Sequence, residues 1–186
     1  MKKLILLFVV ISLSLGQLTA QEPTFEKGDK VLNAGLGLGS TLYTGSYYKN
    51  QVPPLSASFE VGIVDNIIEK GVIGVGGYLG YASYKWDYAN YDWGYKISNF
   101  IIGARGSFHY PLVDKLDTYA GVLTGYRIVR YKEFGTYSGY YDYTPSGGLV
   151  WSGFIGARYY FQENLAAMAE LGYGIAYLTI GVAFKF

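Results

Sequence analysis

The sequence contains no cysteine among its 186 residues, which excludes disulfide bonds and thiolate metal sites. Charged residues make up only 16% of the chain, well below the roughly 25% that is typical of a soluble domain. The formal net charge of +1 gives no electrostatic reason to expect a nucleic acid as a partner. After the N-terminus, no apolar run approaches the roughly 20 residues that a membrane-spanning helix requires.

Tyrosine and glycine are the abundant residues. The chain has 21 Tyr and 26 Gly, and aromatic residues reach 18%, which is too many for an ordinary cytosolic core. Few charges, many tyrosines and moderate hydrophobicity are typical of a membrane β-barrel, because each of its strands is apolar on one face only.

The N-terminus has the pattern of a secretory signal peptide. Lys2 and Lys3 precede an apolar run that ends at Leu15, and a short segment with small residues follows as far as Ala20. Cleavage after Ala20 defines residues 1–20 as the signal peptide and residues 21–186 as the mature domain. Leu18 departs from the usual small residue at the third position before the cut, so cleavage after Gly16 stays open.

The last residues of the chain alternate without a break, and a period of two indicates a β-strand. The large apolar residues share one face, and small or polar residues share the other. The first set is Ile180, Val182, Phe184 and Phe186, and the second is Thr179, Gly181, Ala183 and Lys185.

The same alternation predicts about eight strands, each long enough to cross a bilayer when tilted. Residues 165–171 have a helix-forming composition, but the surrounding pattern favours a strand there. Long connections alternate with short ones, as in barrels with long outer loops and short periplasmic turns, so we expect both termini in the periplasm. The expected strands are 30–41, 55–64, 72–84, 95–110, 118–132, 148–161, 165–173 and 178–186. The expected long connections are 43–54, 85–94 and 133–147, and the short ones are 65–71, 111–117 and 162–164.

These patterns resemble the small outer-membrane β-barrels of the OmpA/OmpX type over the whole mature chain. The resemblance implies an all-β fold, a closed antiparallel up-and-down transmembrane barrel in the outer membrane of a Gram-negative cell. In that family the terminal aromatic strand, here with Phe184 and Phe186, is the signal for the barrel-assembly machinery. We expect a monomer whose partners are the lipid bilayer and this machinery.

Charged residues within the strands fall opposite the large apolar ones. A charged side chain on the lipid face at mid-membrane costs roughly 2–4 kcal/mol, so these residues should point into the lumen. We predict a buried charge network of Glu60, Arg105, Arg158 and Glu170. Arg127 and Arg130 lie on opposite faces of one strand, and the pattern leaves open which of them joins the interior.

The sequence offers little for catalysis. Its one histidine, His109, shares a face with Ser107, but no carboxylate partner is apparent, and we interpret His109 as a lumen or rim residue rather than a catalytic base. Asp87, Asp92 and Asp142 could bind calcium, although scattered loop aspartates are more often solvated. We therefore expect no enzymatic activity, no cofactor and no metal.

Aromatic residues in the expected outer loops are the functional hint. Tyrosine among Ser, Gly and Asn is typical of adaptable binding loops, but Tyr and Trp also form girdles at membrane interfaces. The leading hypothesis is a plugged barrel that binds an extracellular ligand or host surface. The alternatives are a narrow porin-like channel and a lipid A-modifying enzyme. The loop aromatics are Trp86, Tyr88, Tyr91, Trp93, Tyr137, Tyr140, Tyr141 and Tyr143.

Overall fold

The computed structural model describes residues 24–42, 48–87, 93–135 and 146–186. These residues form eight antiparallel strands and no helix that is long and apolar enough to cross a membrane. The strands are β1 (Lys30–Ser40), β2 (Tyr48–Ile67), β3 (Gly71–Asp87), β4 (Trp93–Val113), β5 (Leu116–Gly135), β6 (Gly148–Tyr160), β7 (Leu165–Gly172) and β8 (Ala176–Lys185).

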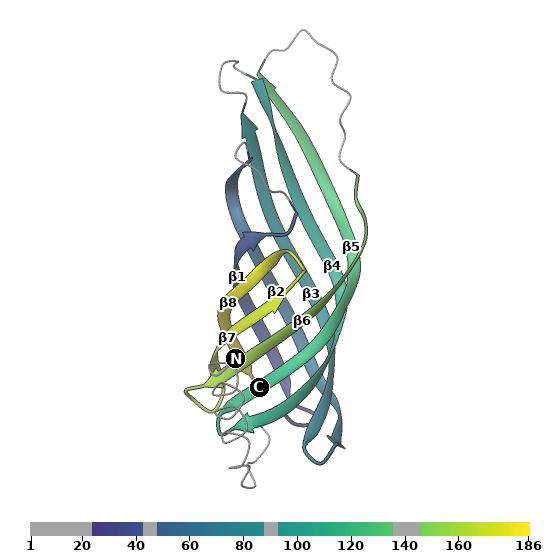
Figure 1. Ribbon diagram of the computed structural model, residues 1–186, viewed down its shortest axis with the longest axis vertical. Helices are drawn as coiled ribbons and strands as arrows, with labels where there is room; N and C mark the ends of the chain where they lie inside the picture. Colours follow the sequence, from purple (N-terminus) through teal and green to yellow (C-terminus); the bar gives the residue numbers. More distant parts are fainter. Residues whose placement is uncertain (1–23, 43–47, 88–92, 136–145) are drawn as a thin grey trace, which may run out of the picture.

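Each strand pairs with its neighbours in the sequence, and β1 also pairs with β8, which closes the barrel (Figure 1). The closing register runs from Val31 opposite Lys185 to Ser40 opposite Ala176. The closed all-β, up-and-down architecture predicted from the sequence is therefore confirmed. Closure satisfies the backbone hydrogen bonds of the first and last strands, which an open edge would leave unpaired.

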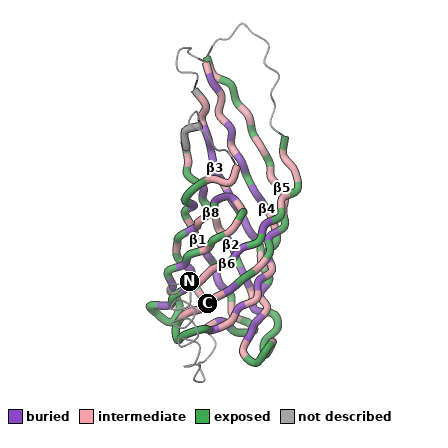
Figure 2. Tube along the Cα trace, viewed as in Figure 1, coloured by how far each residue is buried: buried purple, intermediate pink, exposed green. Residues whose placement is uncertain are grey.

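Buried and exposed residues alternate along the strands (Figure 2). Large apolar side chains point outward: Leu79 is 57% exposed, Ile102 56% and Val122 66%. Polar and charged side chains, together with several aromatic rings, fill the interior. This inversion of an ordinary globular protein, apolar outside and polar inside, is the pattern of a barrel whose outer surface faces lipid.

The barrel wall is much higher on one side than on the other. Strands β2, β3, β4 and β5 have 20, 17, 21 and 20 residues, whereas β7 has only 8. The pairing of β5 with β6 ends at Arg127, and that of β2 with β1 ends at Leu55. Beyond these points β2–β5 continue as a four-stranded sheet, which we name the extended sheet (residues 48–54, 82–87, 93–99 and 128–135) (Figure 1).

The extended sheet replaces parts of all three long connections that the sequence pattern assigned to loops, 43–54, 85–94 and 133–147. β3 continues to Asp87 and β4 begins at Trp93, so residues 85–87 and 93–94 of the expected loop 85–94 lie in strands. β2 already begins at Tyr48, although Pro53 and Pro54 indicated a loop. Proline is tolerated here because this part of β2 has no partner on the β1 side, and the register with β3 shifts nearby.

Two further strand boundaries differ from the expectation. The connection 111–117 shrinks to a turn at Asp114 and Lys115, which places Asp117 inside β5. β7 is shorter than the roughly 9–11 residues expected of a spanning strand. Residues 165–171, despite their helical composition, lie in this strand because β6 and β8 pair with it on both sides.

Candidate functional site

The lower half of the lumen contains a network of buried charges centred on Arg158 of β6. Its guanidinium donates hydrogen bonds to the carboxylate of Glu60, to Asp117 Oδ2 at 2.9 Å and to Asn33 Oδ1 at 3.0 Å. The side chain of Arg158 is fully buried, as is that of Glu60. Strands β1, β2, β5 and β6 are thereby connected across the barrel axis through a single side chain.

A second ion pair lies higher in the lumen. Arg105 of β4 donates from Nη2 to Glu170 Oε2 of β7 at 2.8 Å, and from Nη1 to the hydroxyl of Ser58 at 3.3 Å. The Arg105 guanidinium carbon also lies 4.0 Å from the centre of the Phe154 ring, a cation–π distance. The Tyr119 hydroxyl donates to the same Glu170 oxygen at 3.2 Å.

The structure brings the four sequence-predicted charged residues into the lumen as two ion pairs, which are linked by hydrogen bonds through Ser58 and Asn33. Arg158 pairs with Glu60, and Arg105 pairs with Glu170. The sequence analysis missed Asp117, which is 1% exposed, because it was assigned to a connection. Continuing the alternation of β5 back from Tyr119 would have placed Asp117 on the inward face.

The expectation that His109 lacks a carboxylate partner was wrong. His109 Nδ1 lies 2.8 Å from Asp117 Oδ1, and Nε2 lies 3.2 Å from Glu60 Oε1. Glu60 lies 49 residues away in the sequence, and Asp117, only 8 residues away, lies on the next strand, where its proximity depends on the strand register. The lower network and the ion pair above it together contain three carboxylates and two guanidiniums, and His109 contacts two of these carboxylates.

Ser107, His109 and Asp117 have the connectivity of a hydrolytic triad, since Ser107 Oγ lies 3.1 Å from His109 Nε2. The surroundings do not suit nucleophilic catalysis. The Ser107 hydroxyl donates to Glu60 rather than to the histidine, and the Phe25 ring covers the imidazole with 4.1 Å between ring centres. Because Ser107 is 4% exposed, a substrate carbonyl has no path to its oxygen.

Side chains fill the lumen from the lower end to its middle. Phe25, at the lower end, is 2% exposed. The space beside Arg105 and Glu170 measures only about 10 Å³, at the limit of what holds one water molecule. Glycine provides some of the room, because a Cβ at Gly156 would overlap the ring of Tyr119. The described side chains thus form a plug in this part of the lumen.

Above this plug lies a chamber of about 260 Å³, lined in part by Arg127, Leu123, Val150 and Trp151. Arg127 is the inward arginine of β5 and donates from Nη2 to the Ser146 carbonyl at 3.4 Å. Arg130 points outward, with its guanidinium carbon 5.6 Å from the centre of the Phe100 ring. The structure therefore resolves the alternative that the sequence left open for these two arginines.

The inner face of the extended sheet carries an aromatic patch, which we define as Trp86, Trp93, Tyr95 and Tyr131. The rings of Trp86 and Tyr95 are stacked, with centres 4.9 Å apart and planes at 17°. Trp93 meets Trp86 edge-on at 5.9 Å, and Tyr131 lies 5.3 Å from Tyr95. All four side chains are partly exposed, so the patch is a surface and not a core.

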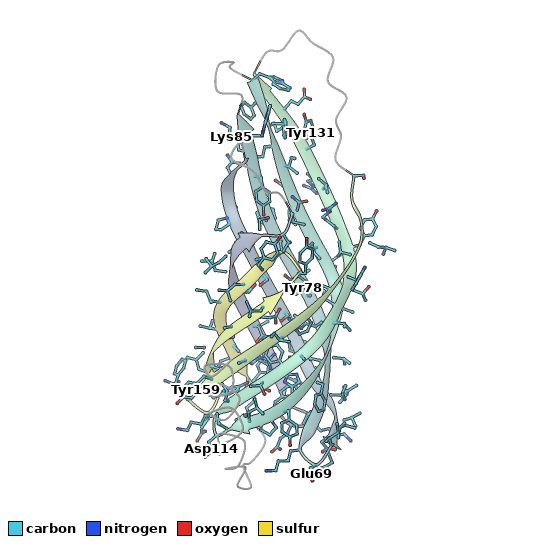
Figure 3. The ribbon with its side chains drawn as sticks, viewed as in Figure 1. Glu69, Tyr78, Lys85, Asp114, Tyr131 and Tyr159 are labelled. Atoms are coloured by element: carbon cyan, nitrogen blue, oxygen red, sulfur yellow. The ribbon has the colours of Figure 1, made fainter. Side chains whose placement is uncertain are left out.

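The hydroxyl of Tyr131 lies at the edge of this patch. Its hydroxyl donates to Glu133 Oε1 at 2.8 Å. Desolvation and this hydrogen bond raise the pKa of Tyr131 to about 12, so the phenol remains neutral at physiological pH. Figure 3 labels Tyr131 near the upper end of the barrel, opposite to Glu69 and Asp114.

The patch overlaps only in part with the aromatic residues singled out in the sequence. Trp86 and Trp93 lie on strands rather than in a loop, and Tyr95 and Tyr131 were not singled out. Among the described residues, no group of three or more His, Asp or Glu side chains could hold a metal ion. Outside the described residues lie Tyr88, Tyr91, Tyr137, Tyr140, Tyr141 and Tyr143, together with Asp92 and Asp142.

No family model and no curated protein matches the chain. Among solved structures, the outer membrane protein OprG from Pseudomonas aeruginosa aligns with a TM-score of 0.51 and 12% identity, over 89% of this chain and 99% of that one. The attachment invasion locus protein Ail of Yersinia pestis, in complex with the heparin analogue sucrose octasulfate, aligns with a TM-score of 0.48 and 9% identity, over 86% and 99%. The N-terminal β-barrel domain of Pseudomonas aeruginosa OprF gives 0.46 and 15%, over 87% and 98%.

At these identities the comparison bears on the fold alone. The chain has the fold of the small outer-membrane β-barrels, the class that OprG represents and that the sequence pattern resembles.

Proposed function

We propose that this chain is an integral outer-membrane protein with a plugged lumen, and that it binds an extracellular ligand or host surface through the aromatic patch of its extended sheet. It is exported with residues 1–20 as a cleaved signal peptide and assembled as a monomer by the barrel-assembly machinery. N-terminal sequencing of the membrane-inserted protein tests the first step, with Gln21 as the expected first residue.

The outward apolar band supports the membrane location. On β4 the outward positions from Tyr110 to Phe100 are ten residues apart. At about 3.3 Å per residue and a tilt near 40°, this stretch rises about 25 Å, the height of the apolar band of outer-membrane barrels. Buried guanidiniums and carboxylates occupy the axis over the same stretch, where they avoid the cost of facing acyl chains.

The packed lower lumen supports a binding role over a transport role. A porin-like channel would need a continuous water path, and the space beside Arg105 is too small for more than one water molecule. Recordings from the purified protein in a planar lipid bilayer test this directly. We expect no steady conductance; regular open steps that scale with salt concentration would favour the narrow channel instead.

The aromatic patch is the observation that carries the binding proposal. Flat, partly exposed Trp and Tyr rings offer a large contact area at a low cost in side-chain entropy. The sheet edges are poor sites for strand addition, because Pro53 and Pro54 lie on one edge and Arg130 and Lys132 on the other. A ligand is therefore expected on the face of the extended sheet.

Adherence of expressing cells to immobilised host-matrix proteins and glycans tests the binding role. We expect Trp86→Ala and Tyr131→Ala to reduce adherence several-fold, because each removes a ring from the patch. Trp151→Ala is the matched control, since Trp151 is 83% exposed but lies on β6, outside the patch. Equal adherence by all three variants, at equal surface expression, would argue against the patch as the binding surface.

A further inference from the structure

Three lysines lie side by side on the outward face of the extended sheet. The register pairs Lys85 of β3 directly with Lys96 of β4, and Lys96 directly with Lys132 of β5. Directly paired residues of neighbouring strands point to the same face of a sheet. This is the outward face, because Lys96 shares it with Ile102, which is 56% exposed, and Lys85 shares it with Leu79.

A row of like charges destabilises the sheet unless an anion binds to it. Neighbouring strands lie about 4.8 Å apart, and like charges directly opposite each other destabilise a sheet. Neither Lys96 nor Lys132 has an ion-pair partner among the described residues, and Arg130 has only the ring of Phe100 beneath it. Lys96, Arg130 and Lys132, with Lys85 beside them, therefore form a compact cationic cluster.

An apolar groove lies directly below this cluster. It has a volume of about 510 Å³, and Leu79, Phe100, Ile102 and Ile128 are among its lining residues, with Arg130 at its charged end. Going up the barrel from the groove, the register first pairs Phe100 with Ile128. Arg130 lies two residues higher, and the pair of Lys96 and Lys132 lies two residues above Arg130. The apolar groove and the cations above it thus lie in the same order as the acyl tail and the head group of a lipid.

The cluster also lies at the height in the membrane where a lipid head group is expected. Phe100 marks the top of the outward apolar band, so the cations lie at the level where acyl chains give way to phosphates. We propose that this outward face binds a phosphorylated lipid of the outer leaflet. Its phosphate contacts Lys96, Arg130 and Lys132, and one acyl chain lies in the groove. This inference rests on the membrane location proposed above, but not on the aromatic patch.

The test compares lipids that differ only in phosphate. The protein is inserted into phosphatidylcholine nanodiscs that contain lipid A or dephosphorylated lipid A, and native mass spectrometry counts the lipid retained. We expect preferential retention of phosphorylated lipid A. The triple variant Lys96→Gln, Arg130→Gln, Lys132→Gln should lower the relative affinity roughly a hundredfold, because each cation near a charged membrane surface contributes about a factor of five.

The variant Lys27→Gln is the matched control, because it makes the same change on an exposed lysine outside the barrel strands, near the opposite end. Unchanged heat-modifiable migration in gels shows that the triple variant folds. Equal retention of both lipids, or equal retention by the triple variant, would overturn the inference. So would binding of soluble dextran sulfate with no preference for lipid A. Failure to enter nanodiscs would instead overturn the membrane location, and this inference with it.

Discussion

Replacing Arg158 with methionine is the most informative single change, because it removes one cation from between two buried carboxylates. The side chains of Arg158, Glu60 and Asp117 are 0%, 0% and 2% exposed. Methionine retains most of the volume but donates no hydrogen bond, so both carboxylates and the Asn33 side chain lose a partner. Breaking a buried ion pair from one side typically costs about 3–5 kcal/mol, and we expect a loss of that size.

Neutralising the carboxylates should recover much of this loss. In the triple variant Arg158→Met, Glu60→Gln, Asp117→Asn, no uncompensated charge remains at this end of the lumen apart from any on His109. Removing a whole buried ion pair is often nearly neutral, so the triple variant should be more stable than Arg158→Met alone. This ordering distinguishes an electrostatic cost from a simple loss of packing.

Urea unfolding in detergent micelles, followed by tryptophan fluorescence, measures these differences. Arg127→Met is the control, because its guanidinium makes only one long hydrogen bond among the described residues, and we expect a cost below about 1 kcal/mol. If Arg158→Met unfolds within that same limit of the unmodified protein, the lower network contributes nothing to stability and the reasoning is refuted.

Three further predictions concern the interior. Glu170→Ala should lower heat resistance and folding yield, because it leaves the buried Arg105 guanidinium without its carboxylate; unchanged gel migration on heating would contradict this. Gly156→Leu should destabilise the barrel by about 1–3 kcal/mol in the same urea assay, since the new side chain would overlap Tyr119, whereas an unchanged midpoint would show that the ring can move. Cells that overproduce the His109→Ala variant should contain the same lipid A as cells that overproduce the unmodified protein. A difference between the mass spectra of the two lipid A samples would favour the enzyme hypothesis.

Most of the fold could be predicted because a β-strand has a simple period. In β8, Ile180 and Val182 are 43% and 51% exposed, while Thr179 and Ala183 are 8% and 0% exposed, as the alternation in the sequence indicates. The regions that were misjudged are those where residue type and pattern disagree. Pro53, Trp86 and Trp93 suggest loops, but they lie in strands that continue beyond the barrel rim.

The candidate sites were harder to predict because they depend on register. The inward direction of Arg105 follows from alternation, but its proximity to Glu170 depends on how far each strand slides against its neighbours. The same holds for His109, whose carboxylate partners come from β2 and β5. The cationic cluster is an extreme case, because Lys85, Lys96 and Lys132 share a row only through the exact pairing of three strands.

Nitroxide labels on the outward face of β5 provide the most direct test that this face lies in lipid. The chain has no cysteine, so single cysteines can be introduced and labelled without background. In reconstituted vesicles, a label at Val122 should collide with oxygen more than with a water-soluble nickel complex, and a label at Lys132 should show the reverse. If the nickel complex reaches both positions equally, the apolar band does not face acyl chains and the account of a membrane barrel fails.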